Sequence, residues 1–184
     1  MPGAFFVRWF YGWCTMRWIW IDKFELFEPG KRAIAVKNVS LAEDHLHDHF
    51  PGFPVMPASL IIEGLAQTSG ILVGAARDFR EKVILAKIGR ATFNRLVRPG
   101  EQIVYDASIA NVSDIGASVR GVISARIGVV DGKVQEIPVG EIELLFSHID
   151  QNMAGMKFPG FNFVFNSEFM ALFETYRRSI NVAL

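Results

Sequence analysis

The alternation of apolar and polar residues predicts a chain made mostly of β-strands. Partly alternating segments at residues 18–27 and 32–39 flank a Pro-Gly turn at residues 28–31, which predicts a β-hairpin. Farther along, turn residues separate further alternating runs, and one of these turns is the Asp131-Gly132 pair typical of a two-residue hairpin loop. The predicted strands after the hairpin are residues 83–88, 91–93, 102–111, 118–130 and 133–146.

Residues 57–77 interrupt this pattern with apolar positions at helical spacing, and Pro57 suits the first turn of a helix. This helix has no broad charged face and contains many glycines and alanines, so we expect other elements to wrap it. Residues 40–56 are predicted to be an irregular loop. One central helix followed by long antiparallel strands predicts an α+β fold in which a curved sheet wraps a buried helix.

The two ends of the chain differ from this middle part. Residues 5–21 are strongly aromatic, but Arg8 and Arg17 interrupt a run that is shorter than the roughly 20 apolar residues of a membrane span. We therefore expect no membrane span and no signal peptide. The segment either packs on its own domain, which we favour, or anchors at a membrane interface.

At the other end, residues 167–178 predict an amphipathic helix that docks on the rest of the protein. We therefore divide the chain into a domain at residues 1–150 and a C-terminal extension at residues 151–184. The residues expected on the docking face are Phe169, Met170, Phe173 and Tyr176.

Composition narrows the functional classes. The chain of 184 residues is 51% hydrophobic, so we expect one domain that buries further surface in an oligomer. Nineteen basic and nineteen acidic residues give no net charge, and this argues against a general attraction to nucleic acid or anionic membranes. Cys14 is the only cysteine, which excludes an intrachain disulfide and suits a cytoplasmic location.

Candidate chemistry is concentrated between the hairpin and the end of the helix. His49 lies in a loop stiffened by prolines and Gly52, and Glu63 is a lone carboxylate among apolar neighbours on the helix. Burying an ionised carboxylate is costly unless it is paired, so Glu63 is a functional candidate. The first helical amides, those of Ala58 and Ser59, can hold an oxygen that gains negative charge.

Three further features have competing interpretations. His45, His47 and His49 alternate as zinc ligands on an extended chain could, but no second ligand cluster completes such a site, so we predict no metal. Gln67, one turn after Glu63, can hydrogen-bond within the site or across a subunit contact. A basic set could bind an acidic carrier protein or could be an ordinary solvated face. It comprises Lys87, Arg90, Arg95 and Arg98.

Two stretches, HFPGFPVMPASLIIEGLAQTSGIL and KIGRATFNRLVRPGEQI, closely resemble the FabZ-type 3-hydroxyacyl-[acyl-carrier-protein] dehydratases, and the resemblance covers residues 18–147. It implies a hot-dog fold and a homodimer with helices back to back, often assembled as a trimer of dimers. It also implies that His49 of one protomer meets Glu63 of the other.

The resemblance further implies that His49 removes a C2 proton from a (3R)-hydroxyacyl thioester while helix amides hold the thioester oxygen. Glu63 then assists departure of the 3-hydroxyl as water. No cofactor is needed, because the phosphopantetheine arm belongs to the substrate on its acyl carrier protein.

This sequence departs from the family at Ala58, where the family usually has glycine, and at Phe53, where it often has histidine. Two other functions remain open, a hot-dog acyl thioesterase and a non-catalytic dehydratase-like partner subunit. The presence of both His49 and Glu63 favours the dehydratase.

Overall fold

The computed structural model describes residues 18–149 and 159–181, and the predictions for Cys14 and most of the aromatic N-terminus lie outside these residues. In the described part, six antiparallel strands form one sheet in the order β1-β2-β4-β5-β6-β3. The strands are β1 (Lys23–Glu28), β2 (Arg32–Asn38), β3 (Val83–Phe93), β4 (Gln102–Val112), β5 (Gly116–Val130) and β6 (Lys133–His148). The helices are α1 (Asp44–Asp48), α2 (Ala58–Ala75) and α4 (Ser167–Asn181).

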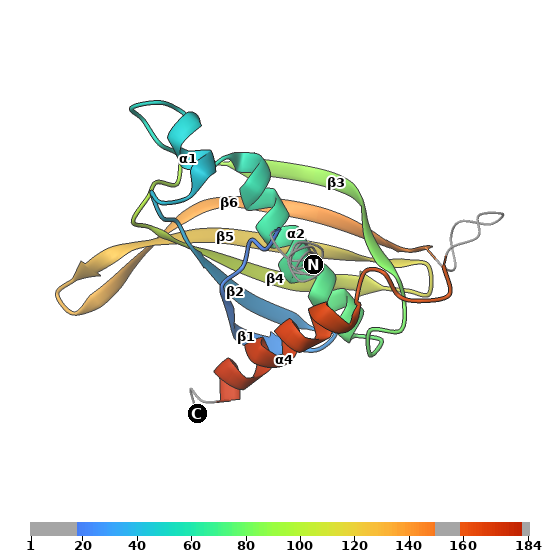
Figure 1. The fold of residues 1–184 in the computed structure, drawn as a ribbon. Helices are drawn as coiled ribbons and strands as arrows, with labels where there is room; N and C mark the ends of the chain where they lie inside the picture. The colour runs from blue at the N-terminus through green and yellow to red at the C-terminus, as the bar shows by residue number, and fades with distance from the viewer. Residues whose placement is uncertain (1–17, 150–158, 182–184) are drawn as a thin grey trace, which may run out of the picture.

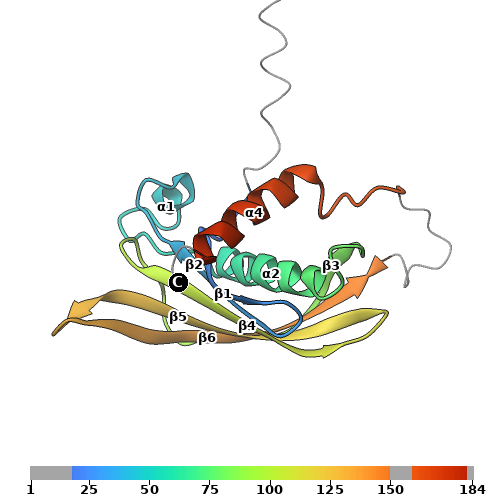
Figure 2. The ribbon, with the colours of Figure 1, turned by 90° about the horizontal axis from the view of Figure 1, so that it is seen from below.

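The sheet curves around α2, as the sequence predicted, and Figures 1 and 2 show α2 on one face of the sheet with α4 beyond it on the same side. The hairpin of β1 and β2 is confirmed. The β5–β6 turn has positive φ at both Asp131 and Gly132, the backbone that a two-residue hairpin loop of this kind requires.

Several predicted boundaries were wrong. The first strand begins at Lys23 and not at residue 18, because backbone groups of Trp18 and Trp20 hydrogen-bond to the side chain of Gln67 on α2. The runs at 83–88 and 91–93 form one strand, because register shifts in its pairing with β6 disturb the alternation without ending the strand. The predicted loop at 40–56 contains the short helix α1, which buries only Leu46 and so has no apolar periodicity. Pro57 is the cap residue before α2, with an extended ψ of 133°, and the helix itself begins at Ala58.

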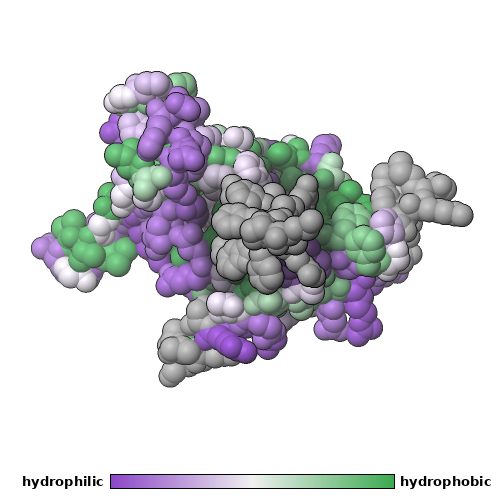
Figure 3. All heavy atoms as spheres, viewed as in Figure 1, coloured by the Kyte–Doolittle hydropathy of each residue, from purple (hydrophilic) through white to green (hydrophobic). Residues whose placement is uncertain are grey.

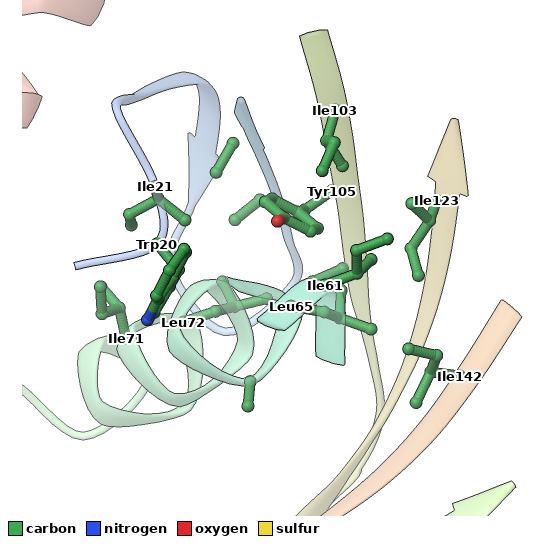
Figure 4. Close-up of a cluster of buried hydrophobic side chains, with 14 of the residues drawn as sticks. Trp20, Ile21, Ile61, Leu65, Ile71, Leu72, Ile103, Tyr105, Ile123 and Ile142 are labelled. Carbon is green, nitrogen blue, oxygen red and sulfur yellow. The ribbon is translucent and has the colours of Figure 1, made fainter. Parts of the chain in front are cut away.

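Small residues let α2 lie close to the sheet. A Cβ at Gly64 would collide with the ring of Tyr105 on β4, which points at the helix in Figure 4. Ile61 and Leu65 fill the space between α2 and the strands. The helix α2 is long and apolar enough to span a membrane, but the core helices of soluble proteins often are too. In this structure α2 packs against the sheet.

The helix α4 is joined to this core by aromatic side chains. Phe173 and Tyr176 are buried and pack edge-on against Phe24 of β1. The other two residues of its predicted docking face, Phe169 and Met170, are half-buried. The C-terminal helix therefore packs on β1 of the sheet and, through Phe169 and Phe173, on Phe79 in the turn after α2.

Apolar side chains also gather on the β5–β6 hairpin, which projects from the body of the protein in Figure 3. Val129, Val130 and Val134 each expose more than half of their surface there. An exposed apolar cluster of this kind usually marks a protein contact.

Candidate active site

The loop that follows α1 fixes the position of His49. Residues 50–53 form a tight turn in which the Phe53 amide donates to the Phe50 carbonyl at 2.9 Å. Gly52 occupies the turn with φ +75°, a conformation that glycine adopts without strain. The supporting role predicted for Gly52 therefore has a structural basis in the geometry of this turn.

The His49 ring is held on two sides. Its Nδ1 lies 3.1 Å from the Val55 carbonyl oxygen, so a neutral ring donates from Nδ1 and keeps the lone pair on Nε2. Its face stacks on Phe50, with ring centroids 4.3 Å apart. This arrangement suits a general base, since the imidazole has a fixed orientation and one nitrogen able to accept a proton.

The start of α2 leaves two amides without acceptors in the helix. The amides of Leu60 and Ile61 both donate to the Pro57 carbonyl, at 3.0 and 3.1 Å. Ala58 and Ser59 precede them in the first turn, where amides have no intrahelical acceptor, and both residues are exposed. Just before the helix, the Met56 amide donates to the Val97 carbonyl at 2.8 Å, and this bond fixes where α2 begins.

Glu63 lies on α2 with Gln67 one turn behind it. Gln67 Nε2 donates to Glu63 Oε1 at 2.9 Å and to the Trp18 carbonyl at 2.8 Å. Gln67 Oε1 accepts from the Trp20 amide at 2.8 Å. Gln67 thus orients the carboxylate and ties it to the segment before β1. No signal in the sequence identified this link, because both tryptophans contribute backbone atoms.

A cavity of about 340 Å³ opens beside Glu63 and Gln67, which form its polar corner. Apolar side chains of α2, β3, the segment before β1 and the C-terminal helix make up most of the remaining wall. His49, Ala58 and Ser59 are not among its lining residues. One protomer therefore brings Glu63 and Gln67 together but leaves His49 and the first amides of α2 outside.

The three alternating histidines point to different partners. His45 Nε2 contacts the Met56 sulfur and His47 Nε2 contacts the Leu41 carbonyl, whereas His49 uses Val55. Burial lowers the pKa of His45, which favours its neutral form. The premise of an extended chain was wrong, because residues 44–48 form α1. Within residues 18–149 and 159–181, no group of three or more potential ligands is arranged to hold a metal.

The basic residues divide into separate surroundings. Arg95 pairs with Glu101 at 2.7 Å. The Arg98 guanidinium lies 4.0 Å from the centroid of the Phe53 ring, beside the turn that follows His49. Lys87 and Arg90 are exposed on β3, an edge strand of the sheet.

Comparisons with known proteins identify the family of this chain and agree with its fold. The family model of the FabA-like domain matches residues 18–137. The chain is 40% identical over 127 residues to the 3-hydroxyacyl-[acyl-carrier-protein] dehydratase FabZ of Clostridium tetani, covering 68% of this chain and 83% of that protein. It is 37% identical over 127 residues to the FabZ of Caldanaerobacter subterraneus subsp. tengcongensis, covering 68% and 84%.

Solved structures give the same architecture at low sequence identity. The hexameric hotdog fold thioesterase of Campylobacter jejuni superposes with a TM-score of 0.51 at 17% identity, covering 82% of this chain and 96% of that one. A thioesterase family protein from Silicibacter pomeroyi gives 0.52 at 13% identity, covering 68% and 82%. The protein is thus a hot-dog protein. Its sequence places it more narrowly, because the chain belongs to the FabZ family of FabA-like proteins.

Proposed function

We propose that this protein is a hydro-lyase that converts (3R)-3-hydroxyacyl thioesters on acyl carrier protein to trans-2-enoyl thioesters in fatty-acid synthesis or a related acyl pathway. The observation that carries the proposal is Glu63, a carboxylate oriented by Gln67 at the polar corner of an apolar cavity, in a chain of the FabZ family. Such a cavity suits an acyl chain, and the carboxylate lies where it can act on an oxygen of that chain.

In this mechanism, Glu63 starts as the neutral carboxylic acid and His49 as the neutral imidazole. His49 Nε2 takes the C2 proton, and the C3 hydroxyl leaves as water with the proton of Glu63. The amides of Ala58 and Ser59 hold the thioester oxygen as negative charge develops on it. Each turnover releases one water and leaves His49 protonated and Glu63 ionised, and one proton returned from His49 to Glu63 restores the starting state. No cofactor enters these steps, and the phosphopantetheine arm comes with the substrate.

The separation of the two groups within one protomer supports a homodimer as the catalytic unit. Glu63 faces the cavity and His49 does not line it, so we propose that His49 of the partner subunit completes each site. Three such dimers can associate further, and the exposed valines of the β5–β6 hairpin offer a surface for this contact.

We propose that Arg98, Lys87 and Arg90 contact the acidic carrier protein, because these side chains are exposed and Arg98 flanks the turn after His49. Arg95 contributes less in this arrangement, since Glu101 already neutralises it. We expect the protein to work in the cytoplasm, where a carrier-bound substrate of this kind is made.

The test is detection of 2-enoyl product from 3-hydroxyacyl thioesters of several lengths on a carrier protein. His49→Ala and Glu63→Gln should each lower kcat by about a thousand-fold or more. Glu174→Gln is the matched control, because Glu174 is an exposed carboxylate on α4, and it should keep full activity. Release of free acid would instead identify a thioesterase, and inactivity at every length would identify a non-catalytic partner.

A further inference from the structure

We propose that the C-terminal segment forms the wall of the cavity that limits the length of the acyl chain, with Leu172 and Phe169 as the residues that set this limit. The inference rests on the proposed function, because it assigns the apolar cavity to the acyl chain of the substrate. The segment at 159–181 lies beyond residues 18–137, which the family model matches.

Two of the residues that line the cavity, Glu63 and Gln67, are polar and hydrogen-bonded to each other, whereas most of the others are apolar. The part of the cavity beside Glu63 and Gln67 must lie near C3 if Glu63 protonates the hydroxyl. Val164, Phe169 and Leu172 contribute to the apolar lining from the C-terminal segment. An acyl chain that enters this cavity with its C3 oxygen at Glu63 therefore lies against side chains of the C-terminal segment. At about 340 Å³ the cavity is near the small end of ligand pockets, which span roughly 300–1,000 Å³.

The wall is anchored to the rest of the protein at three places. The Tyr176 hydroxyl donates to the Ile21 carbonyl at 3.1 Å. The Phe165 ring fills the space over Gly74, where a Cβ would collide with it. Asn162 donates to the carbonyls of Phe79 and Glu81 at 3.0 and 3.2 Å. Displacing a segment held at three places would break these contacts, so its side chains can limit the length of acyl chain that fits in the cavity.

Helical spacing separates the lining residues from their neighbours. Phe169, Leu172 and Tyr176 follow one another at intervals of three and four residues, so they share the face of α4 that borders the cavity. Met170 lies on another face, in a separate hollow with Phe27. Leu172 and Met170 are both half-buried apolar residues on α4, and only Leu172 lines the acyl cavity.

This pair gives a matched experiment. Leu172→Ala enlarges the cavity and Leu172→Trp fills it. Met170→Ala removes a similar side chain from the same helix and leaves the cavity unchanged. The measured quantity is the ratio of kcat/KM for dodecanoyl-length to butyryl-length 3-hydroxyacyl thioesters on the carrier protein. We expect this ratio to rise about ten-fold in Leu172→Ala and fall at least as much in Leu172→Trp. Met170→Ala should leave it within about two-fold of the wild-type value.

The inference is overturned if the Leu172 variants change both lengths by the same factor, or if Met170→Ala shifts the ratio equally. Binding of saturated dodecanoyl and butyryl thioesters of N-acetylcysteamine, measured by calorimetry, separates this result from failure of the proposed function. If no dehydration occurs but dodecanoyl binding is lost selectively in Leu172→Trp, the role of the C-terminal wall is supported and the dehydratase function is refuted. If dehydration occurs with unchanged length preference in every variant, the dehydratase function is supported and the role of the C-terminal wall is refuted.

Discussion

The beginning of α2 and its middle differ in how they hold their functional groups. At the beginning, Ala58 and Ser59 are exposed, and the preceding loop positions His49 through the Val55 carbonyl and the Phe50 ring. In the middle, Glu63 sits at an apolar cavity and is tied through Gln67 to another segment of the chain.

This difference explains why a single chain looks incomplete as a catalyst. The first turn of α2 is exposed and His49 does not line the cavity, whereas Glu63 does. In the proposed mechanism, the partner subunit therefore supplies the base to Glu63. One protomer can therefore contribute to two sites. The first amides of α2 and His49 belong to one site, and Glu63 belongs to the other.

The largest expected effect comes from mixing two inactive variants. If each site joins His49 of one protomer to Glu63 of the other, a dimer of His49→Ala with Glu63→Gln has one intact site. Denaturing and refolding an equal mixture should therefore restore about a quarter of wild-type activity by random pairing. The measurement is the rate of enoyl formation before and after subunit exchange.

The control is each variant refolded alone, which should stay inactive. Activity that stays absent in the mixture, although mass spectrometry of the intact assembly detects mixed dimers, would place both residues in one protomer's site. The proposal that the two parts of α2 contribute to two different sites would then be refuted.

The next effect concerns the support of Glu63. Gln67→Leu removes the donor to Glu63 and leaves the Trp18 carbonyl and Trp20 amide without their partner, which costs about 1–3 kcal/mol. We expect kcat to fall about ten-fold, while KM changes little because the apolar wall remains. Steady-state kinetics separate the two constants, and a variant that raises KM alone would show that Gln67 binds substrate instead of positioning the carboxylate.

How much of this could be read from the sequence depended on the kind of signal. The period of apolar residues located α2 and most strands, and Glu63 was found because a carboxylate is unusual on such a helix. The loop around His49 was recognisable from its prolines and Gly52. Each of these features belongs to side chains or to residues with restricted backbones.

Features made by backbone atoms or by distant segments could not be predicted. Gln67 was a candidate, but its partners are main-chain atoms of Trp18 and Trp20, which have no distinctive sequence pattern. The helix α1 was missed because one buried residue, Leu46, gives no period. The amphipathic helix α4 was predicted, but that Leu172 borders the cavity follows only from the position of α4 against α2.

A smaller effect tests the exposed first turn of α2. Ala58→Gly restores the glycine usual in the family and removes a methyl group beside the proposed site for the thioester oxygen. We expect kcat/KM to rise up to about three-fold, with a stability loss of no more than about 1 kcal/mol. Ala75→Gly, at the last residue of α2, is the control and should lower stability without a gain in rate. A rate gain in both variants would indicate a general loosening of the helix.

The smallest effect on catalysis is expected far from both parts of α2, at Glu25 of β1. Arg126 contacts this carboxylate with two nitrogens, at 2.8 and 2.7 Å, and the hydrogen bond from Arg126 lowers the pKa of Glu25 despite its partial burial. A lowered folded pKa contributes stability that is present above the unfolded value of 4.5 and is lost as pH falls through the folded value.

Glu25→Gln should therefore lower the free energy of unfolding by about 1 kcal/mol at pH 7, since the pair is partly exposed. The difference from wild type should shrink below pH 4.5. Urea unfolding at fixed protein concentration measures it, with Glu174→Gln as the control because its pair with Arg177 is more exposed. Activity should stay unchanged. A loss of rate would mean that this ion pair influences α2 through the sheet, so that the contrast between the two parts of α2 is not local. A stability difference that persists at pH 3 would mean that the difference does not come from ionisation of Glu25.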